Sequence, residues 1–450
     1  MKLPIRLICL LAIAGLIHAQ DNLPSKLDPI AEGYQNHRGF MGSVLVAKGG
    51  KIMLEKGYGL ANWEWDIRNT PDTKFRLGSI TKQFTATAIL QLEEQGKLSL
   101  ADLISNYLPE CPDAWKTITI HQLMNHTSGI PSYTGFPEFS SPKMRRIPLS
   151  PLEIAMLSKD KPLDFQPGEG WKYNNTGYIL LGHIIEKASG EKYDAYLKSH
   201  IFVPLQMNDS GYDWTLPVLK RRASGYRYNP QQKSYENADF LDMSLPYAAG
   251  SLYSTVRDLY VWDRALTSGK LLKKESFERM FTPGRSNYGF GWMIDKSNGH
   301  TRIGHNGGIN GFSTVITRYP DEDAVVIVLS NVENGDAGGV SSRLTSALFG
   351  EKVELPWERK AITLDTQIYE RYTGTYQMPQ FKVTVTVKDG KLMSAPAGQP
   401  MRQMFPESET TFFMEALDGT LEFIPGPDRR ASELVLRQGA NEMRGKRVEP

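Results

Sequence analysis

Four Ser-x-x-Lys pairs occur along the 450 residues of the chain, and each combines a hydroxyl nucleophile with a possible base. Residues three apart on a helix share a face, so the lysine can take the serine proton once its own pKa is lowered. The pairs begin at Ser79, Ser140, Ser158 and Ser189. Only Ser79 follows a glycine and opens a long amphipathic segment, so Ser79 and Lys82 are the leading candidates.

Two interpretations of Ser79 remain open from this local pattern. At a helix start, its hydroxyl and backbone N–H lie at the positive end of the helix dipole, which favours a developing oxyanion. The alternative is that Ser79 only caps the helix, a common role for serine. The pair therefore needs partners elsewhere in the chain before it indicates catalysis.

Two later segments could supply such partners. Tyr173–Asn175 follows a Pro-Gly turn and precedes a helical pattern, while His305–Gly308 precedes an expected strand. The second segment could present an imidazole and a backbone N–H along a sheet edge. His121 and His126 lie five apart without a nearby glutamate pattern, so no metal site is expected.

The elements that must position these residues follow from the hydrophobic periodicity. Gly49-Gly50 divides an apolar segment at residues 42–54 into two strands of a hairpin. Helices are expected at 79–94, 177–188 and 258–266, and strands at 313–318 and 324–329. Strands near both ends of this region bracket a mostly helical insert, which predicts an α/β (α+β) fold with one mainly antiparallel sheet and a helical lobe beside it.

Residues 360–450 are expected to form a separate, small antiparallel β-domain. The composition changes near residues 355–357, and no helical period of any length follows. The segment at 382–387 alternates strictly, and Asp389-Gly390 is a tight-turn signal before 391–393. Further strands are expected at 412–414, 420–424 and 433–436.

The first residues have the pattern of an export signal. Lys2 and Arg6 precede an apolar run of residues 7–17, which is too short to span a bilayer about 30 Å thick, and Ala19 offers a cleavage point. Residues 1–19 are therefore expected to be a signal peptide, with an uncleaved anchor or a lipoprotein at Cys9 as alternatives. The main domain would cover residues 20–355, in the periplasm or outside the cell.

The charge balance excludes some partners. The chain has 52 basic and 50 acidic residues, and removal of Lys2 and Arg6 leaves 50 of each. No basic surface for nucleic acid is expected from this composition. No later segment approaches 18 consecutive apolar residues, so no membrane span is expected after signal cleavage.

Taken in order, several segments resemble the serine β-lactamase-related hydrolases, which include class C β-lactamases, D-alanyl-D-alanine carboxypeptidases, D-aminopeptidases and some esterases. The matching segments run from about residue 40 to 350 and read FRLGSITKQFTATAILQL, ITIHQLMNHTSGIP, PGEGWKYNNTGYILLGHIIEKASG, AAGSLYSTVRDLYVW, YGFGW and GHNGGINGFST. Residues 362–450 resemble the lipocalin-like β-domain often appended to these enzymes. The resemblance implies a β-lactamase/transpeptidase-like fold with a small β-barrel-like domain after it.

The resemblance implies a role for each motif. Ser79 would be the acylated nucleophile, Lys82 and Tyr173 the proton-transfer residues, and Asn175 the amide that holds the lysine and the substrate. The backbone N–H groups of Ser79 and Gly308 would form the oxyanion hole. Burial would lower the pKa of Lys82, and a nearby ammonium would lower that of Tyr173. The proton assignment within this pair stays open.

The third motif departs from the family pattern, because His305 stands where a Lys-Thr-Gly lysine commonly attracts a substrate carboxylate. Imidazole is mostly uncharged at neutral pH but can still donate a hydrogen bond. We therefore count His305, Gly307 and Gly308, with Asn175, as expected substrate-binding residues. A structural role for His305 at a strand edge is the alternative.

The sequence thus predicts a secreted serine hydrolase that works through an acyl-enzyme on an amide or ester. The expected substrate is a D-amino-acid peptide or a peptidoglycan-derived fragment, and neither a metal nor an organic cofactor is needed. The alternatives are a true β-lactamase, a penicillin-binding carboxypeptidase, and a non-catalytic binding protein that keeps the fold. The oligomeric state stays open.

Overall fold

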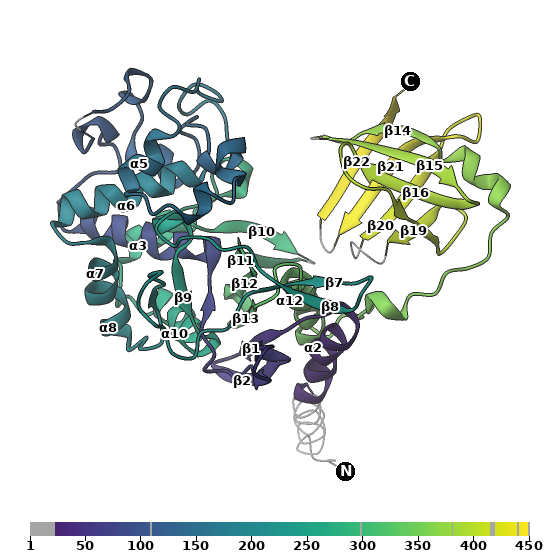
Figure 1. Ribbon diagram of the computed structural model, residues 1–450, viewed down its shortest axis with the longest axis horizontal. Coiled ribbons are helices and arrows are strands. Elements are labelled where there is room, and N and C mark those ends of the chain that lie inside the picture. Colours follow the sequence, from purple (N-terminus) through teal and green to yellow (C-terminus); the bar gives the residue numbers. More distant parts are fainter. Residues whose placement is uncertain are drawn as a thin grey trace, which may run out of the picture. The chain divides into compact units, whose positions relative to one another are not determined.

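The structure is a computed structural model that describes residues 23–108, 110–297, 299–379, 381–414, 419–438 and 441–448 (Figure 1). The expected signal peptide at 1–19 lies outside these ranges. Two compact units divide between Phe349 and Gly350, whereas the sequence suggests a boundary between 355 and 360. No helix within the described ranges is both long and apolar enough to cross a membrane.

The first unit is built on a six-stranded antiparallel sheet in the order β10-β11-β12-β13-β1-β2. The N-terminal hairpin therefore pairs with the last strand of the unit, with Val44 opposite Val328. This register confirms the expectation of one sheet from two distant parts of the chain. The strands are β1 (Gly42–Lys48), β2 (Lys51–Tyr58), β10 (Met293–Ser297), β11 (His300–Ile309), β12 (Phe312–Tyr319) and β13 (Ala324–Ser330).

Strand β13, in the interior of the sheet, has a continuous apolar sequence rather than an alternating one. Every residue of β13 is buried, so both faces of the sheet are covered there. Helix α12 (Ala337–Leu348) packs against β12 and β13, and α10 (Val256–Leu266) packs against β1 and β13. Helix α2 (Pro24–Arg38) contacts β2 and α12.

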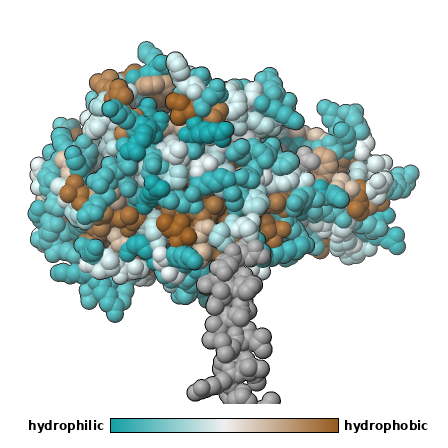
Figure 2. All heavy atoms as spheres, turned by 90° about the horizontal axis from the view of Figure 1, so that it is seen from below, coloured by the Kyte–Doolittle hydropathy of each residue, from teal (hydrophilic) through white to brown (hydrophobic). Residues whose placement is uncertain are grey.

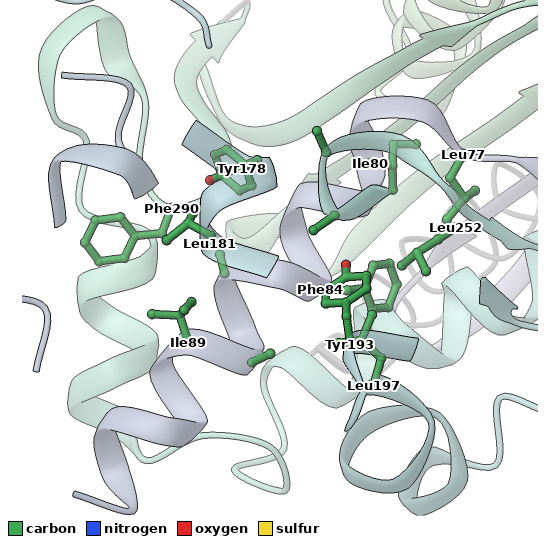
Figure 3. Packing of buried hydrophobic residues seen from close by; sticks show 14 of the residues in the cluster. Leu77, Ile80, Phe84, Ile89, Tyr178, Leu181, Tyr193, Leu197, Leu252 and Phe290 are labelled. Carbon is green, nitrogen blue, oxygen red and sulfur yellow. The ribbon is translucent and has the colours of Figure 1, made fainter. Parts of the chain in front are cut away.

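The helical lobe centres on α3 (Thr81–Glu94), which is buried at every position from Thr81 to Leu92. It packs against α6 (Asn175–Ser189) and α9 (Tyr247–Gly250). Figure 3 shows Phe84 of α3 and Leu181 of α6 within this core. Shorter helices complete the lobe: α4 (Ile120–Met124), α5 (Pro151–Met156), α7 (Tyr193–Leu197), α8 (Val203–Leu205) and α11 (Lys274–Met280).

A small three-stranded sheet links the helical lobe to the segment that carries Ser79. Its order is β5 (Phe75–Arg76), β9 (Leu252–Ser254) and β6 (Gly211–Tyr212). The backbone N–H of Leu77 donates to the carbonyl of Leu252 (2.8 Å). The segments before Ser79 and after α9 are therefore held side by side.

The second unit is a nine-stranded antiparallel sheet in the order β17-β16-β15-β14-β22-β21-β20-β19-β18. Its edge strands β17 (Arg402–Gln403) and β18 (Phe405–Pro406) are separated only by the buried Met404, so the sheet curls into a nearly closed barrel. This result confirms the expected β-domain. The other strands are β14 (Gly374–Gln377), β15 (Lys382–Lys388), β16 (Lys391–Pro396), β19 (Thr411–Met414), β20 (Gly419–Pro425), β21 (Ala431–Gln438) and β22 (Asn441–Val448).

Some elements differ from the sequence-based expectations. The segment His305–Gly308 lies within β11, whereas the sequence placed it before a strand. Its residue types have low strand propensity, and it is a strand because β12 pairs with it. Two short hairpins were not expected. The first, β3 (Leu60–Asn62) with β4 (Ile67–Arg68), lies where no element was assigned. The second, β7 (Tyr226–Asn229) with β8 (Ser234–Asn237), lies in the region expected to contain helices and loops.

On the face of the molecule in Figure 2, hydrophobic residues form separate groups among hydrophilic ones.

Candidate active site

Ser79 lies in a short 3-10 turn (Gly78–Ile80) between β5 and α3. Gly78 has a positive φ of 55°, and a Cβ there would lie 2.9 Å from the backbone nitrogen of Gly308, so glycine is required. The N-cap residue of α3 is Ile80, and no side chain caps this turn or the helix. The N-cap interpretation of Ser79 is therefore wrong, and its hydroxyl is free for another partner.

That partner is Lys82, whose Nζ lies 3.1 Å from the Ser79 Oγ. Lys82 is fully buried, and its Nζ also donates to Asn175 Oδ1 and to the Ala249 carbonyl of α9, both at 2.9 Å. Carbonyl oxygens only accept hydrogen bonds. A neutral amine would direct its two N–H groups at these oxygens and its lone pair at Ser79.

Burial favours this neutral form. It lowers the pKa of Lys82 well below the ordinary value of 10.5, as the sequence analysis expected. After Lys82 accepts the Ser79 proton, the ammonium has three N–H groups and the same three acceptors. The arrangement thus fits Lys82 both before and after the proton transfer.

Tyr173 lies beside the lysine, with Lys82 Nζ 4.9 Å from the centre of its ring. Its hydroxyl is buried and makes no hydrogen bond of normal geometry with the described residues, but it lies near the Ser79 hydroxyl, which acts to lower its pKa. Burial outweighs that effect and raises the pKa of Tyr173. The expectation that the lysine would lower this pKa is therefore wrong, and Tyr173 is a neutral phenol that can donate a proton.

Replacement of Tyr173 with Phe is expected to lower kcat by about 100-fold or more, because it removes only the group that passes a proton. KM should change little, since the ring remains. Steady-state kinetics on an amide substrate would measure both constants. An unchanged kcat would exclude Tyr173 from proton transfer.

The first turn of α6 holds Tyr173 and Asn175 in place. Asn174 caps the helix, because its side chain accepts from the backbone N–H of Gly177 (2.6 Å). Behind it, His126 Nδ1 accepts from the backbone N–H of Asn174 (3.2 Å), and the His126 ring lies 4.5 Å from that of Tyr173. The His-Thr-Ser-Gly turn therefore supports the site from behind.

His305 is buried on β11, with 5% of its surface exposed. Its Nδ1 donates to the Asn306 carbonyl (2.6 Å), so the unprotonated Nε2 accepts from the hydroxyl of Tyr288 (3.0 Å). Burial, assisted by the nearby Lys82, lowers the pKa of His305 to about 4. In this arrangement His305 is neutral and has no N–H left for a substrate, which corrects the expectation that it donates one.

Gly307 and Gly308 bring β11 against the Ser79 turn. A Cβ on Gly307 would lie 1.9 Å from the Leu77 carbonyl, so only glycine permits this contact. Pairing between β10 and β11 stops at Gly304, which leaves one edge of the following residues without that partner. Gly308 is exposed and lies beside Gly78. The oxyanion role of Ser79 and Gly308 stays a prediction that this placement allows.

The structure also separates Ser79 from two of its rivals. The Ser158 hydroxyl is buried and donates to the Pro131 carbonyl (2.9 Å), and that of Ser189 donates to Ile185 within α6 (2.6 Å). Sequence reasoning quoted the segments that contain Ala249 and Tyr288 but assigned neither residue a role, because a segment match does not show which backbone oxygen or ring meets Lys82 or His305. The described ranges contain no cluster of three or more His, Cys, Asp or Glu residues that could hold a metal ion.

A serine–lysine pair at the start of a buried helix, beside the edge of an antiparallel sheet, defines a serine hydrolase of the β-lactamase fold. The chain belongs to the Beta-lactamase family, whose profile matches residues 28–351. A second profile, described as a domain of unknown function (DUF3471), matches residues 358–447. The two matches correspond to the two units of the fold.

Relatives of known name support this assignment. The chain is 35% identical to a penicillin-binding protein of Bacillus subtilis (strain 168), over 94% of this chain and 97% of that protein. Its fold is similar to an octameric penicillin-binding protein homologue from Pyrococcus abyssi (TM-score 0.68, 27% identity, 93% and 99% of the two chains). It is also similar to a D-amino acid amidase from Ochrobactrum anthropi SV3 (TM-score 0.64, 26% identity, 73% and 99%).

Proposed function

We propose that this protein is an exported hydrolase that acts through an acyl-enzyme on amide or ester bonds next to D-amino acids, in free peptides or peptidoglycan fragments. The observation that carries this proposal is the Ser79–Lys82 contact of 3.1 Å, with the other two lysine contacts made to carbonyl oxygens. The site-residue assignments are part of the same proposal.

The proposed reaction has two steps. In the first, the Lys82 amine takes the Ser79 proton while Oγ attacks the substrate carbonyl carbon. The bond to the leaving amine or alcohol breaks, and Tyr173 passes that group a proton, which Lys82 replaces. In the second, a water molecule gives a proton to the same relay and attacks the ester on Ser79. This attack releases the acid and restores the hydroxyl.

The neutral state of His305 supports a choice among substrates. A carboxylate facing His305 would lose water without gaining an opposite charge or a ring N–H, which is unfavourable. One structural relative is named a D-amino acid amidase, and hydrolysis of a simple amide does not require a carboxylate on this side of the scissile bond. We therefore favour substrates that are uncharged on this side of the scissile bond.

A matched pair of substrates tests this choice. The two are an acylated D-Ala-D-Ala dipeptide with a free carboxylate and the same dipeptide with a C-terminal amide. We expect kcat/KM to be about tenfold higher or more for the amide, because its binding leaves no unpaired carboxylate. A preference for the free acid would favour a penicillin-binding carboxypeptidase instead.

Three alternatives remain for comparison. Rapid turnover of nitrocefin would indicate a β-lactamase, whereas slow acylation without turnover would favour a penicillin-binding protein. A non-catalytic binding protein would fail to react with a fluorophosphonate probe. Export through residues 1–19 is tested separately, by the N-terminal sequence of the protein recovered from outside the cytoplasm.

A further inference from the structure

Two hydroxyl groups beside Asn175 form a small ring of hydrogen bonds with it. The backbone N–H of Asn175 donates to Ser132 Oγ (3.1 Å), and its Nδ2 donates to Thr134 Oγ1 (3.1 Å). The two hydroxyl oxygens are 3.0 Å apart. Thr134 belongs to the 3-10 turn Tyr133–Gly135 and is exposed, so it lies at the surface of the site.

This ring favours the orientation in which the Asn175 amide oxygen faces the lysine, because a Thr134 hydroxyl that donates to Ser132 can only accept from the amide. With Nδ2 held by Thr134, the amide oxygen points at Lys82 Nζ, 2.9 Å away. If the amide turned over, an N–H group would face the lysine and compete with Ser79 for the amine lone pair. The ammonium formed after proton transfer would also lose one of its three acceptors.

We propose that Thr134 is a positioning residue for the Ser79–Lys82 reaction, because its hydroxyl holds the Asn175 amide with the oxygen toward Lys82. This inference rests on the proposed function. Counting protons supports it further: each hydroxyl accepts from Asn175, and one donates to the other. When Thr134 is the donor within the pair, it has no proton left for a turned-over amide oxygen, and the proton that remains is that of Ser132.

The inference predicts an effect on both rate and pH dependence. The carbonyl dipole of Asn175 favours the charged form of Lys82 more than the neutral form. Loss of the Thr134 hydroxyl should therefore move the acid limb of the rate–pH profile to lower pH. The plateau rate should fall about tenfold, the value of one hydrogen bond to a charged group.

The test is the rate at which a fluorophosphonate labels Ser79 in the full-length protein, measured from pH 4 to pH 10. Thr134→Val keeps the shape of the side chain but removes the hydroxyl, whereas Thr134→Ser retains it. We expect the Val variant to be labelled about tenfold more slowly with the shifted acid limb. The Ser variant should stay within about twofold of the wild type. Thr267→Val is a matched control, because that exposed hydroxyl donates to Arg264 at the end of α10 (3.3 Å).

The outcomes separate the two proposals. If the wild type is not labelled at all, the proposed function fails. If the wild type is labelled but Thr134→Val has the same rate and pH profile, only the role of Thr134 is overturned. Equal losses in the Val and Ser variants would also overturn it, because the hydroxyl would then not be the group that matters. Thermal unfolding shows that each variant is folded.

Discussion

Replacement of Ser79 with Ala is expected to lower hydrolysis of a simple ester, such as p-nitrophenyl acetate, by about 10⁴-fold or more. The substitution removes the oxygen that forms the acyl-enzyme and leaves the surrounding fold intact, since Ser79 caps no helix. Covalent labelling by a fluorophosphonate should disappear entirely. Mass spectrometry of the labelled wild type would place the adduct on the peptide that contains Ser79.

Ser189→Ala provides a matched control for this experiment, because Ser189 begins another Ser-x-x-Lys pair. It lies at the far end of α6 from Asn175, about 20 Å away along the helix. Its loss should leave both hydrolysis and labelling unchanged. If Ser79→Ala kept full activity, Ser79 would not be the nucleophile, and the Ser-Lys mechanism would have to be abandoned.

The second large effect is expected at Lys82. Lys82→Met fills similar space but has no base, so acylation should fall by about 10³-fold or more. Lys82→Arg restores a positive charge that cannot be deprotonated in a protein. Because the mechanism needs a neutral base rather than a charge, the Arg variant should be as slow as the Met variant. Fluorophosphonate labelling rates measure both, and thermal unfolding shows whether each variant is folded.

The pH dependence of the wild type tests the same point. The base is the neutral amine, so acylation should rise with pH as Lys82 loses its proton and be lost as pH falls through its pKa. Burial lowers that pKa, so the plateau should be reached well below pH 10.5. No fall from Tyr173 ionisation is expected near neutral pH, because burial raises the pKa of its phenol. A rate that kept rising up to pH 10.5 would contradict a buried, neutral Lys82.

Much of the fold could be predicted because its signals are local. The Gly49-Gly50 turn, the helix expected at 79–94 and found at 81–94, and the apolar run of β13 each follow from periodicity and turn residues close in sequence. Strand β11 could not be predicted in this way. It is a strand because β12 pairs along it, and that pairing involves residues outside its own sequence window.

The same distinction between local sequence signals and contacts of distant segments applies to the candidate site. The sequence singled out Ser79, Lys82, Tyr173 and Asn175 as candidates through motifs that together resemble those of one family, and the structure brings these residues together. Tertiary structure alone decided the protonation of Tyr173 and the hydrogen-bond partners of His305. Burial raises the pKa of Tyr173, and Tyr288 and a backbone carbonyl use both ring nitrogens of His305.

The same holds for the groups around the lysine. The Ala249 carbonyl and the hydroxyls of Ser132 and Thr134 carry no pattern that marks them in the sequence. They reach Lys82 and Asn175 only when segments more than 40 residues apart fold together. Motif spacing follows from chain geometry within one helix, whereas desolvation and hydrogen-bond partners depend on contacts between distant segments. The candidate nucleophile was therefore readable in advance, whereas the protonation of Tyr173 and the hydrogen-bond partners of Lys82 and His305 were not.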